Sequence, residues 1–441
     1  MAALENTAPR ALGWDFIAGT IRLSLRPLQA LVAAPTYLFL LTMALMLFRP
    51  PDYRFHSYDR FAFVLLVFVV MIRACVLREK IKLGGPTLWP MCGLILLSAC
   101  DAASQPYNPQ IWSIFASKWL IPFALYYVAG FLFQDETDWR RFEVFALSAL
   151  AYLSLIAILF MVDARQFIFP RYILDESLGI HADRARGPFL QAVANGVALN
   201  ILGLLALDCF RRKRLRGPLA AFLFIALPAA ILATKTRSVW LSFAASIVIL
   251  SFSSSRRLRR TCISMLVVGT AVLLMVTLLS DRKSMGDRLS ERSPVEFRMA
   301  VYEAGTEMFL MKPILGWGSD AMQAELSARI SDFHQDEYYF HNTYLEIGVQ
   351  YGLVGLALYL WLIVSLFRIG KKDRTTDSSN PHEFLDHDFR SLWPVILLVY
   401  LVNGSFVVMN YQFVNGLLFA LAGILAAQNR IRREPEVVRA S

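Results

Sequence analysis

The chain alternates between long apolar runs and polar connections over most of its length. A helix needs roughly 20 apolar residues to cross a bilayer, and a shorter run must borrow flanking residues. The pattern therefore predicts an all-α polytopic membrane protein with about twelve spanning helices. The predicted spans are residues 28–48, 61–77, 88–100, 111–133, 143–163, 189–209, 218–234, 239–254, 262–280, 346–367, 392–409 and 414–427.

The longest polar stretch between apolar runs extends from Asp281 to Glu346. Apolar residues recur there at helical spacing and predict one helix from Pro294 to Met311 and another that begins at Ser319 or Asp320. Each has one apolar face, which suits a helix that lies on the bilayer or packs over the bundle.

This stretch divides the chain into three parts. An N-terminal bundle of about nine helices is predicted over 1–280. One large helical outer loop follows over 281–345, and the C-terminal helices and tail occupy 346–441. Residues 11–25 fit either an amphipathic surface helix or an unstructured lead. The first apolar run is long enough to remain as an anchor, so we expect no cleavable signal peptide.

Composition agrees with a membrane protein. Of 441 residues, 56% are hydrophobic and 18% charged, and the mean hydropathy is +0.48. A soluble chain this apolar could hardly cover its surface with polar groups. The net charge of +10 suggests cytoplasmic anchoring loops rather than a nucleic-acid partner. The five cysteines form no CxxC pair, so neither a disulfide framework nor a zinc site is expected.

Orientation follows from Lys and Arg in the short loops, which favour the cytoplasmic side. The clusters Arg211–Arg214 and Arg256–Arg260 are the strongest such signals. They place both termini in the cytoplasm and the long polar stretch outside, which is the periplasm if the cell has two membranes. This topology predicts a multi-pass protein of the cytoplasmic membrane.

Some basic residues on the outer side break this trend. Charges in or beside a bilayer are costly and usually face a cavity or a partner. These residues are Lys118, Arg184, Arg186, Lys235, Arg237 and Arg298. Together they predict an outward-facing anion pocket. The alternative is that their side chains reach lipid headgroups.

His341 lies where the long polar stretch enters a predicted span. A neutral imidazole there can accept a proton from a hydroxyl group. The alternative is that His341 only begins the helix, with Asn342 or Thr343 as its cap. Glu346 is the next candidate base.

A second polar motif, Asp386-His387-Asp388 after His382, has the residue types of a metal site and matches the DxD pattern of nucleotide-sugar enzymes. The topology places it in a cytoplasmic loop at 370–391, which favours a solvated loop without chemistry. No phosphate-binding glycine loop or GxSxG motif is present.

Three motifs occur in an order that resembles the O-antigen ligase and polymerase superfamily. They are Thr236-Arg237-Ser238, Pro313-Ile314-Leu315-Gly316-Trp317-Gly318, and His341-Asn342-Thr343-Tyr344-Leu345-Glu346 followed by Gly348, Gly352 and Gly355. The resemblance covers roughly 185–365, and the earlier spans are similar only in being apolar.

The resemblance implies a metal-independent inverting glycosyltransferase of the GT-C type, without a cofactor. Its donor would be a glycan on undecaprenyl pyrophosphate. By motif match, Arg237 and Arg298 would bind the pyrophosphate, and His341 would activate the acceptor hydroxyl. Arg186 matches a looser feature, and Lys235 and Lys118 join the predicted anion pocket. Trp317, Tyr338 and Tyr339 are candidates for stacking on the acceptor sugar, or for packing the loop onto the bundle.

Three functions remain open at this stage. The first is a ligase that joins O-antigen to the lipid A–core sugar. The second is a polymerase that extends O-antigen or exopolysaccharide on a growing glycan. The third is a transporter for a lipid-linked glycan, against which stand the lack of an internal repeat and the gathering of unusual charges on the outer face.

Overall fold

A computed structural model describes residues 35–50, 57–179, 181–252, 256–279, 293–330, 339–370 and 384–440. These residues form helices and connecting segments, and no strand occurs among them. The helices that match the predicted spans are α2 (Pro35–Leu47), α3 (Tyr58–Val76), α4 (Leu88–Ala103), α5 to α6 (Pro109–Leu132, with a π-helical turn η1 at Ala116–Leu120), α7 (Glu136–Met161), α8 (Ala192–Arg211), α9 (Gly217–Ala233), α10 (Arg237–Ser251), α11 (Arg256–Leu279), α15 (Thr343–Gly370), α16 (His387–Gly404) and α17 (Gln412–Ala440).

Five helical stretches are long and apolar enough to cross a membrane. They are Pro109–Leu132, Glu136–Met161, Ala192–Arg211, Thr343–Gly370 and Gln412–Arg430. Four shorter apolar helices are α2, α4, α9 and α10. The chain is a multi-pass helical membrane protein. The full number of spans and the GT-C-like arrangement stay predictions.

Hydrogen bonds and ion pairs between the segments that connect the helices fall into two groups, one at each end of the bundle. At the end that we call the outer end, they join Tyr172 to Phe48, Gln412 to Asp59, Lys235 to Asp183, Ser319 to Asp101 and Thr343 to Val407. At the inner end they join Arg214 to Glu143, Arg211 to Asp386 and Arg430 to Lys82. Successive helices therefore run back and forth between the two ends, as alternating spans must.

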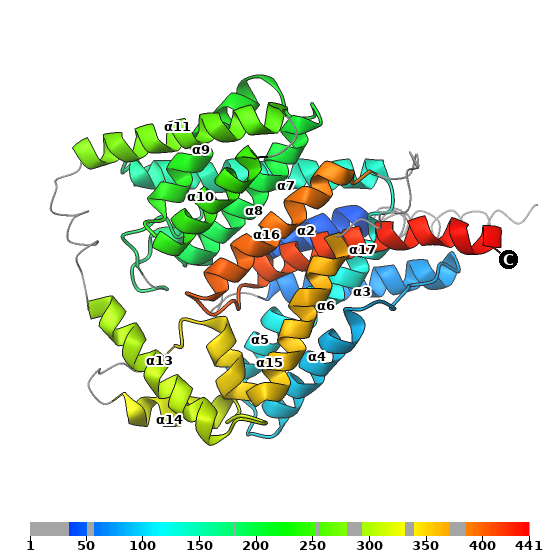
Figure 1. The fold of residues 1–441 in the computed structure, drawn as a ribbon, viewed down its shortest axis with the longest axis vertical. Coiled ribbons are helices and arrows are strands. Elements are labelled where there is room, and N and C mark those ends of the chain that lie inside the picture. Colours follow the sequence, from blue (N-terminus) through cyan, green and yellow to red (C-terminus); the bar gives the residue numbers. More distant parts are fainter. Residues whose placement is uncertain are drawn as a thin grey trace, which may run out of the picture.

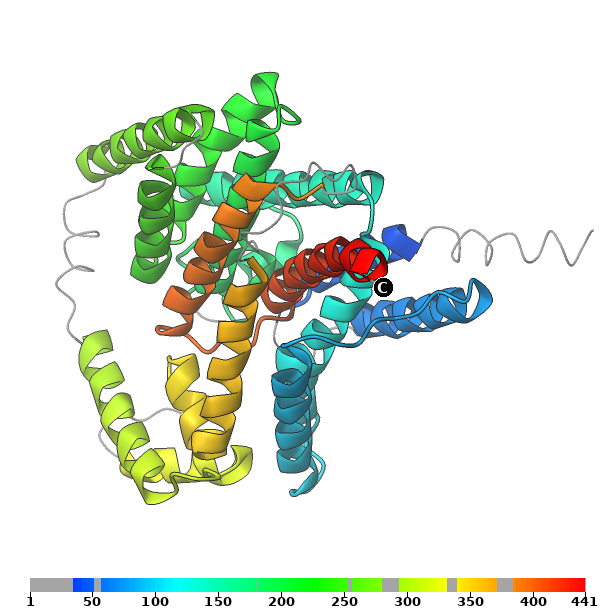
Figure 2. The ribbon, with the colours of Figure 1, turned by 45° about the vertical axis from the view of Figure 1, so that its right-hand side comes forward.

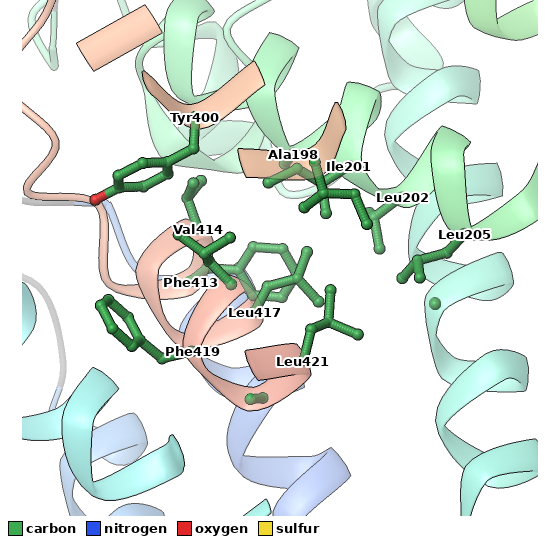
Figure 3. Close-up of a cluster of buried hydrophobic side chains, with 14 of the residues drawn as sticks. Ala198, Ile201, Leu202, Leu205, Tyr400, Phe413, Val414, Leu417, Phe419 and Leu421 are labelled. Carbon is green, nitrogen blue, oxygen red and sulfur yellow. The ribbon is translucent and has the colours of Figure 1, made fainter. Parts of the chain in front are cut away.

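The centre of the bundle is formed by α8 and the first half of α17. Apolar side chains of the two helices meet in Figure 3, where Ile201 and Leu202 of α8 lie near Phe413 and Leu417 of α17. Gly423 of α17 lies so close to α6 that an added Cβ would be 1.9 Å from the Tyr126 carbonyl oxygen. This close approach explains a glycine inside an otherwise apolar helix.

The long polar stretch contains two helices away from the bundle, α13 (Ser293–Met311) and α14 (Ser319–Arg329) (Figures 1 and 2). The prediction of a helix ending at Met311 and another starting at Ser319 is confirmed. Val301 and Met308 of α13, Leu326 of α14, and Phe340 and Val349 form a second apolar cluster. The apolar faces of α13 and α14 therefore pack on each other and on the start of α15.

α15 is broken at Gly352, where φ is 64° and ψ is −159°, and its two pieces point in different directions (Figure 1). The segment between α13 and α14 satisfies the backbone groups that the break exposes. The amides of Trp317 and Gly318 donate to Val349 and Gln350 at 2.9 and 3.0 Å. The amide of Leu353 donates to Pro313 at 2.7 Å. The two glycine-containing motifs of the sequence are thus one structural unit.

The prediction of a solvated loop is wrong for residues 384–391. Phe384 and Leu385 are buried, and the Asp386 side chain accepts from the Phe389 amide at 2.9 Å and so caps α16. Asp386 and Asp388 also form ion pairs with Arg211. Apolar burial and the arginine cluster hold this part of the loop against α8. Residues 371–383, with His382, lie outside the described residues.

Candidate active site

The start of α15 is fixed at the outer end by its polar residues. The Asn342 side chain accepts hydrogen bonds from the amides of Tyr344 and Leu345 at 2.9 and 3.1 Å, which makes Asn342 the helix cap. The Thr343 hydroxyl donates to the Val407 carbonyl at 2.8 Å and accepts from the Met409 amide at 3.0 Å. The residues before the helix therefore have a defined direction relative to the connection at 405–411.

His341 precedes this cap with a left-handed backbone, φ 49°. Its ring makes an edge contact with Phe297, with centroids 6.2 Å apart. Burial, and then the positive charges of Arg298 and His181, lower the pKa of His341 to about 4. An imidazole in these surroundings is neutral near pH 7 and can accept a proton.

Arg298 lies near His341 because α13, which carries it, is hydrogen-bonded to the backbone at His341 and at Ser405. Tyr302, one helical turn after Arg298, donates from its hydroxyl to the carbonyls of His341 and Ser405 at 3.3 and 3.4 Å. The structure thus brings Arg298 of α13, His341 and the end of α16 together.

Lys235 and Arg237 lie in and after the turn between α9 and α10, and both side chains are exposed. Lys235 Nζ donates to the Asp183 carbonyl at 3.2 Å, and the Ala185 amide donates to Ala233 at 3.0 Å. These bonds join the turn to the connection that carries His181. The charge of His181 contributes to the lowered pKa of His341, so the two histidines lie near each other. The turn between α9 and α10 therefore lies at the same outer end as His341.

A second link places Arg237 near α16. Five residues after Arg237, the Ser242 hydroxyl accepts from the Asn403 side chain at 2.9 Å. Asn403 is two residues before Ser405, which accepts from Tyr302. The start of α10 therefore lies beside the end of α16, at the outer end.

Arg186 occupies a different position from the other arginines. Its side chain is 1% exposed, and its guanidinium donates to the carbonyls of Ile173, Asp175 and Leu178. These bonds close the connection at 173–186 into a compact loop. They favour a structural role for Arg186 over direct contact with a ligand.

Lys118 is also engaged, on the π-helical turn between α5 and α6. Its ammonium forms a buried ion pair with Glu346 in the first turn of α15. Neither Lys118 nor the second candidate base, Glu346, therefore offers an unoccupied group to a ligand in this arrangement.

The aromatic candidates differ in their surroundings. Trp317 is partly buried in the second apolar cluster, its indole N–H donates to Met308 at 2.8 Å, and Lys312 covers its ring at 3.8 Å. These contacts favour the packing role that the sequence left open. Tyr339 is 49% exposed and lies two residues before His341 in the chain. Tyr338 lies outside the described residues.

Sequence reasoning missed His181 and Tyr302. His181 stands in an irregular connection with no motif around it, and only the folding of that connection brings it to His341. Tyr302 is on the helix that carries Arg298, and its position one turn later was a usable signal. In the part of the chain that the structure describes, no group of three or more His, Cys, Asp or Glu side chains could hold a metal ion.

Residues 219–360 match the family described as O-antigen ligase. We call residues 219–360 the O-antigen ligase segment. The resemblance suggested by the three sequence motifs is confirmed, and it supports an activity of the O-antigen ligase or polymerase type.

The O-antigen ligase segment contains most of the candidate site. Lys235, Arg237, Arg298, Trp317 and His341 lie within 219–360. Lys118 and Arg186 lie outside it, and their charges are held by Glu346 and by backbone carbonyls. A comparison with curated proteins found no match.

Proposed function

We propose that this O-antigen ligase family protein transfers a glycan from undecaprenyl pyrophosphate to a sugar hydroxyl at the outer face of the bacterial inner membrane. Ligation to lipid A–core is the first assignment, and polymerisation of O-antigen or exopolysaccharide is the alternative. The reaction is of the inverting GT-C type and needs no metal. The observation that carries the proposal is a partly buried His341 whose pKa is lowered by its surroundings, Arg298 among them, within the family segment.

His341 is the proposed general base. When the acceptor oxygen attacks the anomeric carbon of the donor, it must lose its proton. A neutral imidazole accepts that proton, and a side chain that is protonated at pH 7 would not. The low pKa of His341 keeps the imidazole unprotonated before each reaction. The imidazolium that forms then transfers its proton to water after each turnover.

Arg237 and Arg298 are the proposed pyrophosphate ligands, with Lys235 in support. A pyrophosphate leaving group gathers negative charge as the glycosidic bond breaks. Guanidinium groups held in place stabilise that charge through paired hydrogen bonds. The exposure of Arg237 and Lys235 at the outer end is consistent with access for a lipid-linked anion. Tyr339 remains a proposed acceptor contact, and so do Tyr338 and Trp317, although the contacts of Trp317 favour packing.

The deciding experiment is the lipopolysaccharide profile of a strain that lacks the protein. We expect core without any O-antigen, which indicates a ligase. Core that carries a single repeat unit would indicate a polymerase, and donor glycan trapped on the cytoplasmic face would indicate the transporter. A profile identical to that of the parent strain would contradict all three.

A matched complementation separates chemistry from folding. The deletion strain receives either the wild-type chain or the His341→Ala variant, and the amount of each protein in the membrane is measured. The proposal requires that the wild-type chain restores the profile and that an equally abundant variant does not.

A further inference from the structure

The ion pair between Lys118 and Glu346 connects two elements that are far apart in the sequence. The Lys118 side chain is 4% exposed and the Glu346 side chain 14%. Two charges buried to this degree hold each other, because either one alone would be left without compensation in an apolar region. The pair therefore sets a narrow range of distances between the turn at 116–120 and the first turn of α15.

Each partner stands on an irregular or terminal piece of backbone. Lys118 is in the π-helical turn at Ala116–Leu120, a widened turn of the kind that is frequent at functional sites. Glu346 is five residues after His341 and three after Thr343. The π-helical turn presents the ammonium to the first turn of the helix that follows His341.

The first turn of α15 is also fixed by contacts that do not involve Lys118. Thr343 is bonded to Val407 and Met409, and the Tyr344 hydroxyl donates to the Leu401 carbonyl at 3.0 Å. These bonds attach the turn to the end of α16 and the connection after it. The Lys118–Glu346 pair supplies the attachment to α5 and α6, so the start of α15 is held from separate elements.

The surroundings of Lys118 argue against direct contact with a phosphate. Lys118 lines a small cavity whose other walls are almost all apolar or aromatic. The lining includes Trp119, Tyr359, Leu366, Tyr400 and Phe419. A pyrophosphate in such a cavity would lose its water and gain few donors in return.

We propose that the Lys118–Glu346 ion pair is a positioning device, which holds the start of α15 so that His341 faces the reacting hydroxyl. Neither residue touches the substrate. The inference rests on the proposed function, since it needs His341 to be the base. Displacement of a general base by about 1 Å can cost 10²-fold in rate, so a short link of this kind has a measurable effect.

The test uses the full-length protein in liposomes, with lipid-linked glycan as donor and core oligosaccharide as acceptor. The variants are Glu346→Gln, Lys118→Met and the combined Lys118→Met/Glu346→Leu. We expect each single variant to lower kcat by about 10- to 100-fold with the donor KM nearly unchanged. The combined variant should lose about as much activity as either single variant, because all three remove the same link.

Glu143→Gln is the matched control. It breaks another buried carboxylate pair, Glu143 with Arg214, at the inner end. It should lower the thermal stability of the protein and leave kcat unchanged. If Glu346→Gln does not accumulate, Lys118→Arg, which keeps the pair, and the combined variant give the same comparison.

Several results would overturn the inference. A raised donor KM with normal kcat would make Lys118 a substrate ligand, and loss of the acidic limb of the pH profile in Glu346→Gln would make Glu346 the base. A combined variant whose loss equals the product of the two single losses would mean that the residues act separately and that the pair is not the cause. If His341→Ala is inactive while Glu346→Gln is normal, only the positioning inference fails. If His341→Ala is active, the proposed base fails.

Discussion

At the scale of single residues, His341 has the most unusual surroundings in the site. Burial is the largest cause of its lowered pKa, and Arg298 is the second. The same arginine therefore does two things in the proposed mechanism. It attracts the pyrophosphate, and it keeps the neighbouring imidazole in the neutral form that a base requires.

The pH dependence of turnover follows from this arrangement. Because the folded pKa of His341 is about 4, the base stays neutral as the pH falls below 6.5, and activity is lost only as the pH falls toward 4. Arg298→Gln removes one cause of the low pKa, so the acidic limb should move toward neutral pH, together with a higher donor KM. An acidic limb that stays in place in Arg298→Gln would contradict the electrostatic contact.

His341→Ala should lower kcat by about 10²–10⁴-fold with little change in donor binding.

Arg237 tests the anion site by itself. Arg237→Ala should abolish transfer while the protein still reaches the membrane. Arg237→Lys should recover little activity, because an ammonium lacks the planar pair of donors that matches a phosphate. Transfer in liposomes measures both. Full activity of the alanine variant would remove Arg237 from the site.

At the scale of elements, the break in α15 depends on the segment at 313–318. An added Cβ at Gly352 would lie 2.3 Å from the Ile314 carbonyl oxygen, and one at Gly316 would lie 2.5 Å from Val349 and Gln350. Both glycines have positive φ. Glycine is needed on each side of this contact, because the backbones touch there without room for a side chain.

Gly352→Ala should therefore destabilise the protein strongly. Its backbone lies in a region that is essentially reserved for glycine, which alone costs about 1–3 kcal/mol, and the contact with Ile314 adds to this. Gly348→Ala is the control, since its Cβ would approach only Phe309, at 3.5 Å. The unfolding temperature in detergent should fall for Gly352→Ala and stay the same or rise for Gly348→Ala. Equal stability of the two variants would contradict the capped break.

At the scale of the whole molecule, the polar contacts sort the connections into an outer and an inner end. This alternation has a direct test. A reporter that is active only outside the cytoplasm should work after Arg329, in α14, and fail at Ser378. A cytoplasmic reporter should give the reverse. A reversed pattern at Arg329 would place His341 on the cytoplasmic face and remove access to an outward-facing donor, and one at Ser378 would contradict the alternation of the helices between the two ends.

The helices were predictable because their cause is local. An apolar run of sufficient length must form its own backbone hydrogen bonds in lipid, so each predicted span coincides with a helix in the structure. The motifs around Arg237, Trp317 and His341 were visible for a similar reason: each is a short contiguous stretch. The family match at 219–360 agrees with what those stretches implied.

What the sequence alone determined was thus the membrane class, the helices and the resemblance to the O-antigen ligase and polymerase superfamily, while the structure chose Asn342 over Thr343 as the cap. The tertiary structure decided which of the candidate charges are buried inside the protein and which are exposed. Arg186 and Lys118 were candidates for the same anion pocket as Arg298, yet Arg186 donates to backbone carbonyls and Lys118 is paired with Glu346. It also brought His181 to His341 and placed 313–318 against Gly352. These outcomes depend on contacts between distant segments, which no local pattern of residues contains.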